Sequence, residues 1–117
     1  MKYMLMGYVD EAQLGTLSQE QVQAALGAHM AYVQALKEAG AWLDNRRLVG
    51  SSTAATVRLK DGKSQVLDGP YSDTKEQFGG YWLIEAPDMD AALAWAARCP
   101  IAQHGVMEVR QVWAPSA

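Results

Sequence analysis

Two segments of the chain are apolar at both alternating positions, and this constrains any sheet that they form. Near the N-terminus, Tyr3 and Leu5 alternate with Met4 and Met6, and residues 80–85 repeat the pattern. Successive side chains of a strand point to opposite faces of the sheet. A sheet of such strands exposes a large apolar patch if one face stays in water. The sequence therefore predicts a sheet that is covered on both faces, by helices on one and by a second copy of the chain on the other.

The first helix is predicted to begin after Ser18 and to end before Gly40. Ser18 and Gln21 match the capping-box pattern at a helix N-terminus. Gly40 is the residue type that commonly ends a helix. Between them lies a stripe of residues spaced four and three apart, as one helix face requires: Val22, Leu26, His29, Val33 and Leu36.

A second helix is predicted over residues 89–98, with Asp88 as its N-cap and Pro100 as its stop. Asp61-Gly62 is a dipeptide favoured in two-residue hairpin turns. The expected strands, with that hairpin in the middle, cover residues 2–8, 42–49, 56–60, 64–67, 80–85 and 106–113, and residues 68–78 form a loop. This order predicts an α+β, ferredoxin-like antiparallel sheet with two helices on one face and an inserted β-hairpin.

Length and composition indicate one soluble domain over residues 1–117. The net charge is −3 and the basic residues are scattered, which argues against a nucleic-acid partner. No apolar stretch approaches the ~20 residues that span a bilayer, and the N-terminus does not match a signal peptide, so no membrane association and a cytoplasmic location are expected. The single cysteine, Cys99, is predicted to be a small buried residue.

Residues 68–76 read Asp-Gly-Pro-Tyr-Ser-Asp-Thr-Lys-Glu and are followed by Gly79-Gly80-Tyr81. Gly69-Pro70 is a turn sequence, and Asp68 is suited to an Asx-turn. This run, together with residues 51–58 and the terminal Glu108-Val109-Arg110, resembles the YCII-related family with its DGPF signature. Two differences are Tyr71 where the family has Phe, and Gln111 where it often has Pro.

The resemblance implies a ferredoxin-like fold that dimerises sheet to sheet as a dimeric α+β barrel. It implies no known reaction. Some members are encoded beside sigma factors of the extracytoplasmic-function type, which suggests a regulatory or stress context. In the wider group, a helix histidine paired with an aspartate is thought to form an active site.

His29 is the main catalytic candidate, because a histidine on the inward stripe can move protons at neutral pH. It would need an orienting carboxylate, for which Asp44 and Asp68 are the candidates, and Asp68 is taken as its catalytic partner. The alternative is a core histidine with satisfied ring nitrogens. His104, in a loop, is expected to lie at the surface.

The candidate ligand-binding residues are Lys75, Tyr81, Glu108 and Arg110. Glu108 and Arg110 are two residues apart, so they share one face of their strand. There they either form an interfacial ion pair or hold an anion. Tyr81 shares a face with Glu85 on the neighbouring strand, and Lys75 belongs to the 68–76 run, where a solvated surface role is the alternative.

The histidines and the cysteine lack metal-ligand spacing, so no metal and no cofactor are expected. These features lead to two hypotheses. One is a homodimer with a small-molecule pocket and acid/base chemistry of lyase or isomerase type, with His29 as proton carrier and Arg110 as anion holder. The other is a non-enzymatic binding or regulatory module on the same scaffold.

Overall fold

A four-stranded antiparallel sheet forms the centre of the protein in the computed structural model, which describes residues 1–115. Its strands are β1 (Lys2–Val9), β2 (Trp42–Arg47), β5 (Gln77–Glu85) and β6 (Val106–Gln111). Their order across the sheet is β2-β5-β1-β6, so the two central strands are the two apolar segments of the sequence. The ferredoxin-like α+β fold predicted from the sequence is confirmed.

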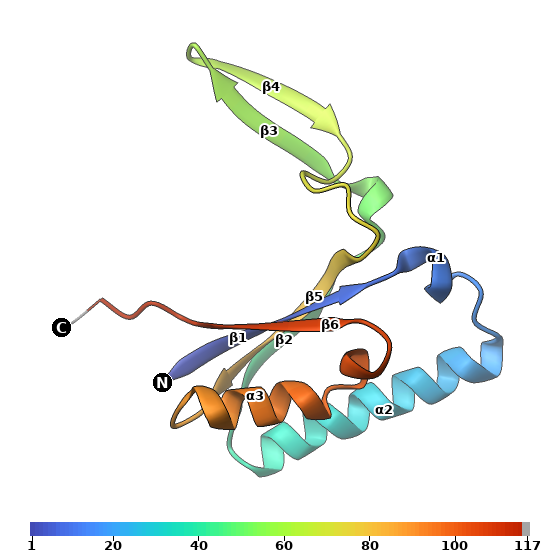
Figure 1. Ribbon diagram of the computed structural model, residues 1–117, viewed down its shortest axis with the longest axis vertical. Coiled ribbons are helices and arrows are strands. Elements are labelled where there is room, and N and C mark those ends of the chain that lie inside the picture. Colours follow the sequence, from blue (N-terminus) through green and yellow to red (C-terminus); the bar gives the residue numbers. More distant parts are fainter. Residues whose placement is uncertain (116–117) are drawn as a thin grey trace.

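Helices α2 (Gln19–Glu38) and α3 (Met89–Arg98) both lie on one side of this sheet (Figure 1). The core between the two layers includes Tyr3, Leu5, Leu36 and Ile84, which are almost completely buried. Three short elements were not predicted, because one or two turns carry little periodicity: the helix α1 (Glu11–Leu14) and the 3-10 turns η1 (Ser51–Thr53) and η2 (Pro100–Gln103).

Local signals set the ends of both long helices as predicted. Ser18 and Gln21 form a complete capping box at the start of α2, with hydrogen bonds of 3.1 and 2.8 Å. Asp88 caps α3 by accepting a 2.8 Å hydrogen bond from the Ala91 backbone N–H. Gly40 has a positive φ of 69° just beyond α2, a conformation that glycine adopts without strain.

The inward face of α2 differs from the predicted stripe. Val22 and Leu26 remain 40% and 42% exposed, whereas the buried residues are Tyr32 and Leu36 in the C-terminal half. Tyr32 is held inward because its hydroxyl donates a 2.7 Å hydrogen bond to the carbonyl of Trp95 in α3. The first turns of α2 therefore extend beyond the core instead of sealing it.

Strands β3 (Ala55–Lys60) and β4 (Lys63–Asp68) pair only with each other, and residues 55–68 are called the arm. Asp61 and Gly62 have φ values of 52° and 76°, as the predicted two-residue turn requires. The arm stands out on the side of the sheet away from α2 and α3 (Figure 1). It makes the radius of gyration 16.4 Å, against about 13 Å for a compact domain of this length.

Three strand ends differ from the prediction by two or more residues. β5 begins at Gln77, three residues before Gly80; β2 ends at Arg47, two residues before Val49; and β6 ends at Gln111, two residues before Trp113. Near its start, β5 pairs irregularly with β1, since Gly7 pairs with Gly80 but Tyr8 pairs with Phe78. Cys99 is 1% exposed, as predicted, and its burial raises the pKa of the thiol to about 11.

We expect Gly80→Ala to destabilise the protein by about 1–3 kcal/mol, because its Cβ would lie 2.7 Å from the backbone oxygen of Arg46. Gly27→Ala is the matched control. Gly27 lies within α2 with no atom in reach of an added Cβ, so this change should stabilise by about 1 kcal/mol. Urea unfolding of both variants measures the two effects, and a Gly80→Ala protein as stable as wild type would contradict the close approach of β2 and β5.

Candidate functional site

The face of the sheet that the helices leave uncovered, called the open face, carries an ordered array of side chains. The strand register places them in two rows across the sheet. The first row is Arg46, Tyr81, Met6 and Glu108, and the second is Asp44, Leu83, Met4 and Arg110. Apolar residues and one tyrosine thus occupy the middle, and charges of alternating sign occupy the four corners.

Two tyrosine hydroxyls on this face donate hydrogen bonds to carboxylates. Tyr8 donates to Oε1 of Glu108 at 3.3 Å, and Tyr81 donates to Oδ2 of Asp44 at 3.1 Å. Asp44 also forms a 2.6 Å ion pair with Arg46. Burial and the neighbouring Glu108 raise the pKa of Tyr8, and the hydrogen bond to Asp44 raises that of Tyr81. Both phenols therefore remain protonated donors at neutral pH.

A β-bulge brings Phe78 onto the open face. Because Gly79 is an extra residue on β5, Phe78 lies opposite Tyr8 and its side chain faces the same way. The two rings are 5.6 Å apart between centroids. A side chain at Gly79 would press against Val9 at 3.1 Å, which explains the glycine at the bulge.

Residues 68–76, called the signature loop, form a groove with these two rings. The groove has a volume of about 340 Å³ and is lined by Met6, Tyr8, Pro70, Tyr71, Ser72, Thr74, Glu76, Gln77 and Phe78. Its wall on the loop side is open to solvent, since Tyr71 is 77% exposed. The run that identifies the chain in sequence therefore lies beside the aromatic part of the open face.

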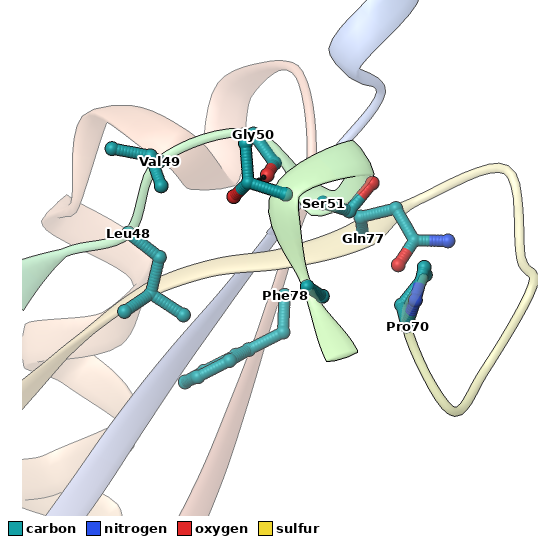
Figure 2. Close-up of a pocket in the computed structure, with 9 residues that line it drawn as sticks. Leu48, Val49, Gly50, Ser51, Pro70, Gln77 and Phe78 are labelled. Atoms are coloured by element: carbon teal, nitrogen blue, oxygen red, sulfur yellow. Dashed lines mark hydrogen bonds between the residues drawn. The ribbon is translucent and has the colours of Figure 1, made fainter. Parts of the chain in front are cut away.

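A second groove, of about 330 Å³, lies between the segment that follows β2 and the start of β5 (Figure 2). Leu48 and Phe78 lie on one side of it, and Gln77 and Pro70 lie on the other. The residues between β2 and the arm, from Leu48 to Ala54, supply most of its lining. The two grooves share Pro70, Gln77 and Phe78, so the signature loop shapes both.

Three of the four predicted ligand-binding residues lie together on the open face. Tyr81, Glu108 and Arg110 all lie on the open face, Tyr81 and Glu108 in the first row and Arg110 in the second. Lys75 is an exposed residue of the signature loop. Asp68 lies at the end of β4, exposed and paired with Ala55 in the arm ladder. Within residues 1–115, the Asp68 side chain makes no hydrogen bond, so the expected Asx-turn is not formed.

His29 lies on the opposite side of the sheet, between α2 and β5. Its ring stacks on Trp82 with centroids 5.8 Å apart and planes 5° from parallel. Burial lowers the pKa of His29 below 6.5, and the positive charges of Arg47 and His104 lower it further. Neither expected carboxylate orients it, because Asp44 faces the open side and Asp68 belongs to the arm.

A buried donor lies beside His29. Trp82 is 5% exposed, and its indole N–H has no hydrogen-bond partner among the described residues. The stacked imidazole and indole therefore lie together on the helix side of the sheet. Neither of the two grooves described above includes His29.

Tyr8 and Phe78 were not identified from the sequence. Tyr8 stands at the end of a strand as an ordinary aromatic residue, and a strict two-residue alternation would place Phe78 with Trp82, facing the helices. The one available signal was Gly79-Gly80, because paired glycines inside a strand often mark a bulge.

No group of three or more metal-binding side chains occurs within residues 1–115. No helix of that same part of the chain is long and apolar enough to cross a membrane.

Comparison with known proteins agrees with the fold. The family model described as the YCII-related domain matches residues 1–115. An uncharacterized protein of Rhizobium meliloti (strain 1021) is 35% identical over 96 residues, which are 82% of this chain and 77% of that protein. A solved structure of 5-chloro-2-hydroxyhydroquinone dehydrochlorinase from Burkholderia phenoliruptrix AC1100, in complex with 2,5-dihydroxybenzoquinone, aligns with a TM-score of 0.58 at 16% identity and covers 97% of this chain and 94% of that one.

We expect His29 to titrate below 6.5 by NMR, and Arg47→Gln to raise its pKa because a positive charge is removed. Since the folded-state pKa is the lower one, His29 contributes stability that is fully present above pH 6.5 and is lost as the pH falls through that lower value. His29→Gln should therefore flatten the fall in unfolding free energy in this window. A His29 pKa at or above 6.5 would contradict its half-buried position.

Proposed function

Since the chain belongs to the YCII-related family, we propose that it is a homodimeric protein that binds a small molecule in the groove between the signature loop and the open face. A proton transfer on the bound molecule, of lyase or isomerase type, is the chemistry that we assign to it. The observation that carries the proposal is the Tyr8–Glu108 hydrogen bond beside an apolar, aromatic groove. Small-molecule sites typically combine such apolar walls with a few placed polar groups.

The polar groups on the open face suit different parts of a ligand. Glu108 is a hydrogen-bond acceptor for a ligand hydroxyl, and a proton acceptor once Tyr8 turns to the ligand. Arg110 lies two residues further along the same face of β6 and suits a carboxylate, phenolate or other anion. The rings of Tyr8 and Phe78 offer flat apolar surfaces to a planar ligand.

The corner charges of the open face favour a second copy as its cover. A two-fold axis between two such faces, directed along or across the strands, places each arginine over a carboxylate of the other copy. The apolar middle of the face, with Met4, Met6 and Leu83, would then be buried. A dimer of this kind also gives the groove the wall that it lacks beside Tyr71.

The ligand bound to the dehydrochlorinase is a first probe for binding to this protein. Its likeness to this chain at 16% identity concerns the fold alone, but its ligand is a flat ring with hydroxyl and carbonyl groups. Such a ring has a shape and polarity that suit the aromatic walls of the groove and the Glu108 acceptor beside it. We therefore choose 2,5-dihydroxybenzoquinone for the binding measurement.

His29 is the second candidate for the proton step. Its lowered pKa keeps the imidazole neutral at pH 7, able to accept a proton, and it stacks on Trp82, whose indole N–H has no partner within residues 1–115. The two candidates lie on opposite sides of the sheet, so variants separate them. The non-enzymatic alternative corresponds to a protein that binds in the groove but turns over no ligand.

Glu108→Gln should weaken binding of 2,5-dihydroxybenzoquinone by about tenfold, because an amide replaces a charged acceptor. Thermal shift and calorimetry measure the loss. Glu38→Gln is the matched control, since Glu38 is exposed on α2, where its carboxylate accepts a hydrogen bond from Gln34. If 2,5-dihydroxybenzoquinone stabilises wild type and Glu108→Gln equally, the groove is not its binding site. Loss of binding in His29→Ala alone would assign the site to the helix side of the sheet.

The second expectation concerns assembly. Arg110→Glu should weaken the dimer by at least about tenfold, because it puts like charges together between the two faces. Arg98→Glu, the same charge change on the far side of the sheet in α3, serves as control. Sedimentation equilibrium distinguishes them. A wild-type protein that remains monomeric at micromolar concentration would refute the paired open faces.

A further inference from the structure

The arm turns one of its two faces toward the signature loop. Alternate residues of a strand point the same way, so Thr56, Arg58 and Lys60 share one face of β3. The Thr56 hydroxyl donates a 2.9 Å hydrogen bond to the carbonyl of Gly69. The guanidinium of Arg58 lies 5.9 Å from the ring centroid of Tyr71, which lines the groove between the signature loop and the open face. These contacts identify the face of the arm that meets the loop, called the loop-side face.

Hydrogen bonds at the base of the arm hold this face in place. The Gly69 N–H donates to the Ala54 carbonyl at 2.7 Å, which joins the chain on either side of the arm. The Ser51 N–H donates a 2.8 Å hydrogen bond to the Glu11 carboxylate, and the Ser51 hydroxyl donates a second one. The arm that carries Arg58 to Tyr71 is therefore tied down at its base.

The loop-side face is positively charged. Its six members, all within the described part of the chain, are Thr56, Arg58, Lys60, Lys63, Gln65 and Leu67. None of these six residues is acidic, and Lys60 and Lys63 are direct partners in the ladder. Asp68 belongs to the other face of the arm, and Asp61 belongs to the turn. The side of the arm that faces Tyr71 therefore attracts anions.

The guanidinium of Arg58 is available to a ligand. Arg58 is exposed, and no carboxylate of residues 1–115 forms an ion pair with it. Its distance from the Tyr71 ring is near the outer limit of cation–π contacts, about 6 Å, so this contact leaves the N–H groups free. A guanidinium presents its donors in a planar fork that matches a carboxylate.

The carboxylates of the groove lie elsewhere. Glu76 lines the groove just before β5, and Glu108 accepts the Tyr8 hydrogen bond on β6. Both attract a hydroxyl and repel an anion. None of the lining residues, which all belong to the described part of the chain, is a lysine or an arginine. A ligand that satisfies both charge types therefore directs a hydroxyl to Glu108 and an anionic group to Arg58.

Arg110 is the other cation near the groove. It pairs with Met4 in the register, one row beyond Met6, and it does not line the groove. Arg110 is also one of the corner charges that a second copy would meet. Arg58 differs in that its guanidinium lies beside the ring of a residue that lines the groove.

We propose that the ligand of the groove is a hydroxylated aromatic carboxylate, with its hydroxyl on Glu108 and its carboxylate on Arg58. Its ring lies against the rings of Tyr8 and Phe78. Arg58 is then a specificity-determining residue that the arm supplies to the site. This ligand class rests on the proposed function, because it takes the groove as the binding site.

Two ligands of almost equal shape and different charge test this class: 2,5-dihydroxybenzoate and 2,5-dihydroxybenzamide. Calorimetry should show that wild type binds the carboxylate at least about tenfold more tightly than the amide, because only the carboxylate forms a charge-assisted pair with Arg58. Arg58→Gln should remove this preference and bind the amide as wild type does, and Arg58→Lys should keep part of it. Lys60→Gln, the same charge change two residues along the same face, is the matched control and should keep the preference.

Four results overturn the assignment. They are equal affinity of wild type for the two ligands, a preference that survives in Arg58→Gln, a preference that is lost only in Arg110→Gln, and equal loss of both ligands in Arg58→Gln. In the last case Arg58 shapes the groove through Tyr71 instead of holding the anion.

Glu108→Gln separates this assignment from the proposed function. If it weakens both ligands while wild type binds them equally, the groove stands and the ligand class falls. If Glu108→Gln binds both ligands like wild type while the preference still depends on Arg58, the anion role of Arg58 stands and the Glu108 site of the proposed function falls. A wild-type protein that binds 2,5-dihydroxybenzoquinone but neither of these ligands overturns the ligand class alone.

Discussion

The one-sided covering of the sheet is the constraint on which the rest of the structure depends. Two helices bury the side of Tyr3, Leu5 and Ile84, and nothing in residues 1–115 packs over the side of Met4, Met6 and Leu83. A contiguous exposed apolar patch of this kind marks an interaction surface. The corner charges flank that surface, and the groove beside Tyr8 lies at its edge.

Much of the fold was predictable because its signals are local. The capping box at Ser18, the Asp88 cap and the Asp61-Gly62 turn each depend on a few neighbouring residues, and each formed as predicted. The stripe on α2 was predicted less well. Periodicity identifies one face of a helix, but the contact of Tyr32 with Trp82 and its hydrogen bond to α3 decide which turns are buried.

The candidate site was less predictable because it depends on register. One extra residue at Gly79 changes the face on which Phe78 lies, and the two-residue alternation of a strand does not predict that shift. His29 does not meet Asp44 or Asp68 for a related reason. Successive residues of a strand point to opposite faces of the sheet. Asp44 points to the open face, whereas His29 lies on the helix side. Glu108 and Arg110, two residues apart on a regular strand, were correctly expected to share a face.

The signature loop connects the arm, the groove and β5. It leaves the arm at Asp68, forms the groove wall with Pro70 and Tyr71, and joins β5 just before the bulge at Gly79. Gly69 has a φ of 102°, a conformation that glycine adopts without strain, and the ring of Pro70 fixes the φ of Pro70 itself. The loop therefore joins the arm to the groove through a short, restrained segment, which gives a physical reason for its glycine and proline.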